Sequence, residues 1–193
     1  MKIIFLGTNG WYDTKTGNTL SILIATQEYS IVLDAGTGFA KLDQYLSNSN
    51  PIFLFLSHFH LDHLIGLHTL FKFSFKQKLT LSGPKGTEKV LRALLKQPFT
   101  APLEHLSYKT EILEMPGSED RFPFSVKPMD LVHPPLSMGY RFQVEGKVIA
   151  YCPDTGYCEN AVTLPKGRIF LFPNAPSCQV KTGNNTVCHR RYP

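Results

Sequence analysis

Four residues of metal-binding type stand close together after a short apolar run, and this cluster constrains the sequence more than any other feature. The run Ile52 to Leu56 has the composition of a buried strand, and His58, His60, Asp62 and His63 follow it. In an extended segment residues i and i+2 point to the same side, so His58 and His60 can bind one ion. A turn then directs Asp62 and His63 toward a neighbouring point. Imidazole nitrogens suit zinc, and a carboxylate beside them also suits manganese or iron.

Two distant loops offer further ligands, which are needed because four ligands from one loop cannot enclose two ions. His133 closes the expected strand Phe124–Val132, and Asp154 follows the apolar strand Val148 to Tyr151. Taken alone, each residue has an ordinary explanation: a strand-end histidine is commonly packed or solvated, and Pro-Asp-Thr-Gly is commonly a turn. Three such loops in one chain favour metal binding.

Segments of strand and helix character alternate along the chain, which predicts the α/β class with two sheets faced by helices. The expected strands are Ile3–Leu6, Thr19–Ala25, Ser30–Leu33, Ile52–Leu56, Lys78–Ser82, Phe124–Val132, Met138–Val144 and Val148–Tyr151, and the expected helices are Phe39–Leu46, Leu64–Phe71 and Thr87–Lys96. Glu145-Gly146 predicts a hairpin turn between the last two strands.

Length and composition fit one globular domain. The chain has 193 residues, of which 42% are hydrophobic, enough for a buried core and too many for a disordered chain. The longest apolar run is far shorter than the ~20 residues of a membrane span. The N-terminus lacks the apolar region and cleavage site of a secretory signal. We therefore expect a cytoplasmic protein without a membrane partner.

The net charge of +5 gives weak support for a nucleic-acid partner, because most of it lies at one end. Four basic residues (Arg168, Lys181, Arg190 and Arg191) supply +4, and no acidic residue occurs from Asn160 onward. The body of the chain is nearly neutral and offers little electrostatic steering. Nucleic acid is thus allowed as a partner but not favoured.

Six short motifs together carry a family resemblance. They are Leu6-Gly7-Thr8, Leu33-Asp34-Ala35-Gly36-Thr37-Gly38, His58-x-His60-x-Asp62-His63, Ser82-Gly83-Pro84, His133 followed by Gly139-Tyr140-Arg141-Phe142, and Tyr151-x-x-Asp154-Thr155. With them the chain, from Met1 to about Gly167, resembles the metallo-β-lactamase-fold hydrolase superfamily. Within it, the chain is most similar to the ribonuclease Z-like and related phosphodiesterase branch.

The resemblance implies a fold and a ligand set. The fold is an αββα sandwich of two mixed sheets with helices outside and the metals at one edge. In that pattern His58, His60 and His133 bind a first ion, Asp62 and His63 bind a second, and Asp154 bridges both. Asp34 would steady the histidine loop without binding metal. Zinc is the first expectation, with manganese or iron as alternatives.

The resemblance also implies an activity. We expect a metal-dependent hydrolase of phosphodiesterase type, in which a metal-bound hydroxide attacks a phosphodiester or another small ester. Asp62 would act as a catalytic residue by accepting a proton as well as binding metal. Transfer-RNA maturation is not favoured, because 86–133 holds no Gly/Pro-rich insertion resembling an RNA-gripping arm. The resemblance allows a homodimer.

The pattern departs from the family after Gly167. Residues 1–167 are expected to form a metallo-β-lactamase-like domain that is incomplete at its C-terminal end, and 168–193 a poorly ordered basic tail. A last strand at Ile169–Phe172 is compatible with the sequence, but no late histidine except His189 is available, and its surroundings do not resemble a metal loop. We hypothesise a shifted reading frame near the codon of Gly167. We also expect weakened binding of the second ion, which would impair activity.

Three alternatives remain open. The chain could be a non-catalytic metal-binding remnant of such an enzyme. It could also be a lactonase- or thioesterase-type hydrolase, since these share the histidine motif. A flavodiiron-type redox protein on the same fold is disfavoured, because its site usually carries a glutamate where this chain has His60. Metal stoichiometry separates the enzyme from the remnant.

Overall fold

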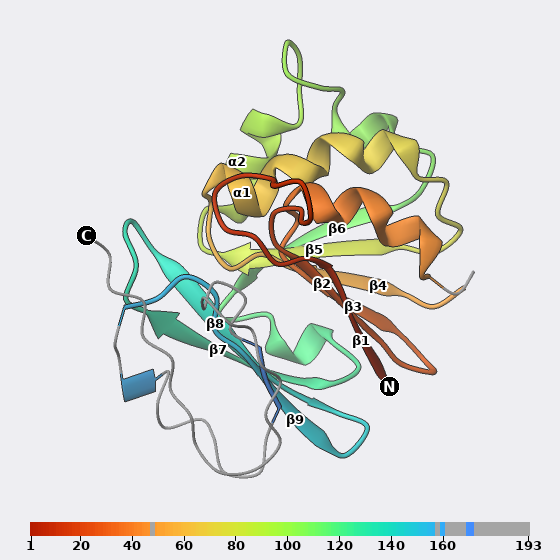
Figure 1. Cartoon of the computed structure of the whole chain (residues 1–193). Coiled ribbons are helices and arrows are strands. Elements are labelled where there is room, and N and C mark those ends of the chain that lie inside the picture. Colours follow the sequence, from red (N-terminus) through yellow and green to blue (C-terminus); the bar gives the residue numbers. More distant parts are fainter. Residues whose placement is uncertain (47–48, 157–158, 161–168, 172–193) are drawn as a thin grey trace. The chain divides into compact units, whose positions relative to one another are not determined.

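Strands dominate both parts of the molecule. The computed structural model describes residues 1–46, 49–156, 159–160 and 169–171, which divide into two compact units, Met1–Met115 and Pro116–Pro193. Within the described residues each unit contains one sheet (Figure 1).

The first unit is built on a six-stranded sheet in the order β1-β2-β3-β4-β5-β6. Its strands are β1 (Lys2–Gly7), β2 (Ser21–Ala25), β3 (Ser30–Leu33), β4 (Ile52–Phe55), β5 (Leu79–Pro84) and β6 (Thr110–Met115). The first three strands pair antiparallel, and β3 to β6 pair parallel. Every residue of β3, β4 and β5 is buried. Full burial of this kind is typical of parallel strands that are covered on both faces.

Helices of the first unit lie along one face of its sheet, drawn from orange to green in Figure 1. They are η1 (Thr37–Gln44), α1 (Leu61–Leu64), η2 (Ile65–Lys72), α2 (Thr87–Leu94) and the short η3 (Leu103–His105). Successive strand residues point to opposite faces, so alternate residues meet the helices. The resulting core contains Leu23, Val32, Leu54 and Leu81 from the strands and Phe39, Leu42, Leu67 and Leu91 from the helices.

The second unit contains a four-stranded sheet in the order β10-β9-β8-β7. Its elements are η4 (Glu119–Arg121), β7 (Ser125–Leu131), β8 (Ser137–Val144), β9 (Lys147–Tyr151) and β10 (Ile169–Leu171). β7, β8 and β9 pair antiparallel, whereas β10 runs parallel to β9. Glu145 and Gly146 form the predicted hairpin turn with φ angles of 45° and 71°, the left-handed values that a tight hairpin connection requires.

The sequence-based prediction of an α/β chain with two sheets is confirmed, and it differs from the structure in detail. The two segments predicted as helices at 39–46 and 64–71 are largely 3-10 helices, η1 and η2. The segment at 169–171 forms a strand, while the rest of the predicted tail lies outside the described residues. Across the part of the chain that the structure describes, no helix is both long and apolar enough to cross a membrane.

Candidate metal centre

The metal-binding sequence cluster occupies the loop directly after β4. Leu56 continues the strand, because its N–H donates to the carbonyl of Ser82 at 2.7 Å. The chain stays extended through His60, whose ψ angle is 145°, and α1 begins at Leu61. Ser57, His58 and His63 are fully buried. The loop thus holds its side chains inside the protein although it belongs to no regular element.

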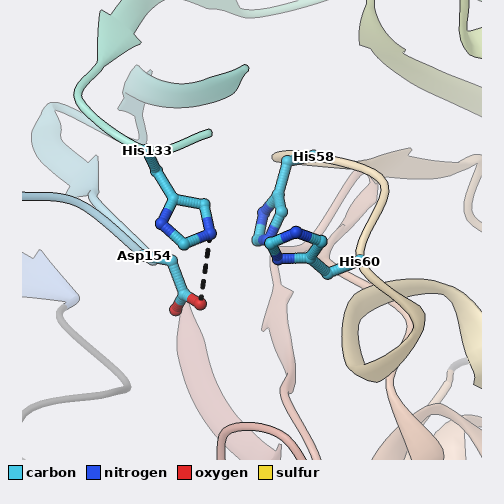
Figure 2. A group of neighbouring side chains, drawn as sticks. All are labelled: His58, His60, His133 and Asp154. Carbon is cyan, nitrogen blue, oxygen red and sulfur yellow. Dashed lines mark hydrogen bonds and ion pairs between the residues drawn. The ribbon is translucent and has the colours of Figure 1, made fainter. Parts of the chain in front are cut away.

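His58 and His60 form one pair of candidate ligands (Figure 2). Nε2 of His58 lies 3.0 Å from Nδ1 of His60, and the two ring centroids are 4.6 Å apart. Nδ1 of His58 is 2.9 Å from the hydroxyl of Ser57, so this hydroxyl fixes the orientation of the ring. The i, i+2 spacing therefore does bring the two imidazoles to one side of the segment, as the sequence predicts.

Asp62 and His63 form a second pair. Oδ2 of Asp62 lies 3.5 Å from Nε2 of His63, and Asp62 is 12% exposed whereas His63 is fully buried. Nδ1 of His63 faces Asp34 Oδ2 at 2.7 Å. The turn into α1 thus directs both side chains to a common point, again as predicted.

Asp34 links the two pairs. Its carboxylate accepts hydrogen bonds from the Ser57 N–H and the Ser57 hydroxyl, both at 2.7 Å, besides facing His63. Since the Ser57 hydroxyl donates to Asp34, it accepts from Nδ1 of His58, and Nε2 of His58 is left as the metal-binding atom. Asp34 is itself buried, at the end of β3, with a left-handed φ of 55° that aspartate tolerates better than most residues. It therefore orients His58 through Ser57 and His63 directly.

Sequence reasoning missed one contact to this loop. The backbone N–H of Trp11 donates to Oδ2 of Asp62 at 2.7 Å across 51 residues of sequence. Trp11 has a φ of 67°, and the N–H of Tyr12 donates to the Gly10 carbonyl at 2.8 Å, which closes a tight turn around Trp11. A bulky residue at positive φ costs about 1–3 kcal/mol and persists only where its surroundings impose it. The 8–18 segment contains no motif that would have signalled this contact.

The second unit holds the other two predicted ligands, each in the loop that follows a strand. His133 follows β7 and Asp154 follows β9. Their Nε2 and Oδ2 atoms lie 3.9 Å apart, the ion pair marked by the dashed line in Figure 2. The Thr155 hydroxyl accepts a hydrogen bond from the N–H of Val132, and the Gly156 N–H donates to the Val132 carbonyl at 2.6 Å. These bonds join the two loops and hold His133 beside Asp154.

The donor set fits a divalent metal. Zinc lies about 2.0–2.2 Å from histidine nitrogens and carboxylate oxygens, so two ligands of one tetrahedral ion are roughly 3.4 Å apart. The separations within the three pairs are 3.0, 3.5 and 3.9 Å. Each buried histidine of the loop also has its Nδ1 bonded to an orienting oxygen, a common arrangement for metal-binding histidines. His68 and His105 belong to no such pair, and His189 lies outside the described residues.

Comparison with known proteins supports this interpretation. The family model of the beta-lactamase superfamily domain matches residues 29–171. Ribonuclease Z of Nanoarchaeum equitans is 29% identical over 154 residues, which are 76% of this chain and 47% of that protein. The chain thus spans about half the length of the curated relatives it matches first.

Solved structures show the fold. Human tRNase Z, short form, superimposes with a TM-score of 0.66 at 21% identity, covering 87% of this chain and 75% of that one. Zn²⁺-bound PqqB from Methylobacterium extorquens superimposes with a TM-score of 0.62 at 16% identity, covering 91% and 73%. Because the family model matches most of this chain, the chain belongs to the beta-lactamase superfamily, and it has the metallo-β-lactamase fold.

Proposed function

We propose that this protein is a metal-dependent hydrolase that cleaves phosphodiesters. The observation that carries the proposal is the geometry of the loop after β4, on which two pairs of candidate ligands lie close together. Asp34 and Ser57 fix the orientation of this loop's buried histidine rings through hydrogen bonds. Burying polar side chains costs free energy unless each of them is hydrogen-bonded. A buried and hydrogen-bonded histidine loop therefore indicates a function for these side chains.

The proposed ligand sets follow the family pattern. His58, His60 and His133 would hold one divalent ion, Asp62 and His63 a second, and Asp154 both. Supporting this are the three close donor pairs His58–His60, Asp62–His63 and His133–Asp154. Zinc suits the imidazole-rich set best, and manganese or iron suit the carboxylates. With no late histidine among the described residues, the Asp62–His63 ion would be the weaker of the two.

The chain's own residues would orient and deprotonate the nucleophile. Divalent ions at such a site lower the pKa of a bound water toward neutrality and neutralise charge on the phosphate oxygens. Oδ2 of Asp62 already accepts the Trp11 N–H, and its other oxygen would accept a proton from the attacking water. Asp34 and Ser57 keep Nε2 of His58 and of His63 toward the metals by bonding to the opposite nitrogens.

A phosphodiester substrate is supported by the relatives. The curated proteins that match first are ribonucleases, whose names imply cleavage of RNA phosphodiesters. The near-neutral body of this chain favours a small phosphodiester over a long polyanion. We propose action in the cytoplasm.

Metal content and turnover together test the proposal. Protein purified without added metal would be analysed by elemental mass spectrometry and then assayed on bis(p-nitrophenyl) phosphate with Zn²⁺ or Mn²⁺. We expect one tightly bound ion, a second at higher metal concentration, and turnover that His58→Ala abolishes. His68→Ala is the matched control, because this exposed histidine binds only the Ile65 carbonyl among the described contacts. Bound metal without turnover above His58→Ala would instead identify a non-catalytic remnant.

A further inference from the structure

Two strongly exposed aromatic side chains of the first unit stand next to each other in the 8–18 loop. Trp11 is 84% exposed and Tyr12 is 66% exposed, and their ring centroids are 6.4 Å apart at 50°. Large aromatic side chains are normally buried, so an exposed adjacent pair indicates a ligand-binding surface.

The loop that carries the pair is fixed at its base. Asp13 accepts hydrogen bonds from the Thr19 N–H at 2.8 Å, from Asn18 at 3.1 Å and from the Thr37 hydroxyl. Asn9 holds the two sides of the loop together through Thr14 and the carbonyl of Gly17. The exposed rings are therefore presented by an ordered loop, and binding to them would cost little conformational entropy.

The same loop reaches the proposed active site. The Trp11 N–H bonds to Oδ2 of Asp62, and both groups belong to the first unit. The main chain of Trp11 thus lies within one hydrogen bond of a proposed metal ligand, while its side chain extends into solvent. A phosphodiester bound by a metal ion at Asp62 would have its neighbouring groups close to the loop that carries the indole ring.

We infer that Trp11 and Tyr12 form a stacking platform for a nucleobase of a nucleotide phosphodiester. This inference rests on the proposed function and narrows its substrate class. Stacking of a base on an aromatic side chain accepts any base, because every base has a flat π-face. The proposed substrate therefore carries a base next to the bond to be cleaved, and its base sequence is of secondary importance. In this proposal Trp11 binds substrate through its indole ring.

Trp11 is the single tryptophan of the chain, so its fluorescence reports on the platform directly. Metal-free protein, which cannot turn over, would be titrated with the dinucleotide uridylyl-(3′→5′)-uridine and, in parallel, with dimethyl phosphate. We expect saturable quenching by the dinucleotide and none by dimethyl phosphate, which has the same charge but no ring. Equal responses to both ligands, or no response to either, would overturn the inference.

Variants separate stacking from simple apolar contact. For hydrolysis of the dinucleotide by metal-loaded enzyme, we expect Trp11→Leu to raise KM about tenfold with little change in kcat, and Trp11→Phe to raise it much less. Substitution of the side chain keeps the N–H that bonds to Asp62, and unchanged metal content would verify this. Equal KM values for the Leu and Phe variants would contradict stacking.

The outcomes for the platform and for the hydrolase are distinguishable. Quenching of metal-free protein by the dinucleotide, without turnover by the metal-loaded protein, would support the platform and refute the proposed function. Turnover of bis(p-nitrophenyl) phosphate without dinucleotide quenching would support the hydrolase and refute the platform.

Discussion

Asp34 Oδ2 lies 2.7 Å from Nδ1 of His63, and both side chains are completely buried. This contact determines which ring nitrogen carries the proton: with Nδ1 donating to the carboxylate, Nε2 is the atom that faces Asp62. The carboxylate therefore selects the metal-binding tautomer of His63 before any metal arrives.

Replacement of Asp34 by asparagine should disturb this selection. The NH₂ group of an asparagine directed at Nδ1 of His63 would donate to that nitrogen and so favour the tautomer protonated at Nε2. That tautomer cannot bind metal through Nε2. We expect Asp34→Asn to weaken metal binding about 10- to 100-fold, measured by competition with a chromophoric chelator. Asp43→Asn is the matched control, since Asp43 is a partly exposed carboxylate paired with Lys72 on the protein surface. An unchanged metal affinity in Asp34→Asn would show that Asp34 does not orient His63.

Gly66 lies where no side chain fits. A Cβ atom at this position would lie 2.1 Å from the carbonyl oxygen of Gly36 and 2.8 Å from that of Ala35, and both are backbone atoms that cannot rotate away. We expect Gly66→Ala to lower the free energy of unfolding by about 1–3 kcal/mol, as overpacking generally does. Urea denaturation followed by circular dichroism measures the change. In Gly156→Ala the new methyl group would meet only ordinary contacts at 3.4 Å or more, so this control should unfold near the wild-type midpoint.

Asp13 should make the aromatic loop sensitive to acid. Burial alone would raise the pKa of Asp13, but hydrogen bonds from Thr37, the Thr19 N–H and Asn18 outweigh it and hold the pKa below the ordinary value of 3.8. A carboxyl group whose pKa is lowered by folding stabilises the folded loop above pH 3.8, and this contribution disappears as the pH falls through the folded-state pKa. We expect Trp11 emission to be constant from neutral pH to about 4 and to change below it.

The variant Asp13→Asn isolates that effect. It should show altered Trp11 emission already at neutral pH and a smaller change on acidification, because the titrating group is gone. Acid transitions of equal size in Asp13→Asn and the wild type would assign the change to other carboxylates.

Tyr108 should become a source of instability in alkaline solution. Its hydroxyl donates to the Leu70 carbonyl at 2.8 Å, and burial raises its pKa well above the ordinary value of 10. A group whose pKa is raised by folding stabilises the protein below the unfolded-state value and loses that contribution as the pH rises beyond it. We expect stability to fall above pH 10 in the wild type and to fall less in Tyr108→Phe, as measured by urea midpoints. At neutral pH the variant should lose about 0.5–1.5 kcal/mol with the hydrogen bond.

The sequence predicts the sheets better than the helices, for a reason visible in the apolar spacing. Short runs such as those of β3 and β4 are rich in Ile, Val and Phe, and their length and β-branched or aromatic content favour buried strands over helices. In η1 and η2, by contrast, apolar residues recur every third position, as in Phe39 and Leu42 or Leu67 and Leu70. That spacing suits both an α-helix and the three-residue turn of a 3-10 helix, so sequence alone cannot separate them.

The candidate site divides in a similar way between local and distant information. The pairings His58–His60 and Asp62–His63 follow from neighbouring positions on one segment, and the sequence predicts both. The bond from Trp11 to Asp62 depends on how two loops meet, and no local pattern encodes it. The assignment of all six residues to two ions remains a prediction, as do the domain boundary at 167 and the altered reading frame.

The strand that precedes the histidine loop should protect part of that loop from local opening. β4 pairs with β3 on one side and β5 on the other, and all its residues are buried. Central strands of this kind exchange their amide hydrogens with deuterium only when the whole unit opens, whereas ordinary loops exchange through local opening. Because the Ser57 N–H bonds to buried Asp34, that protection extends beyond the strand. The histidines should thus lose their arrangement only when the first unit itself unfolds.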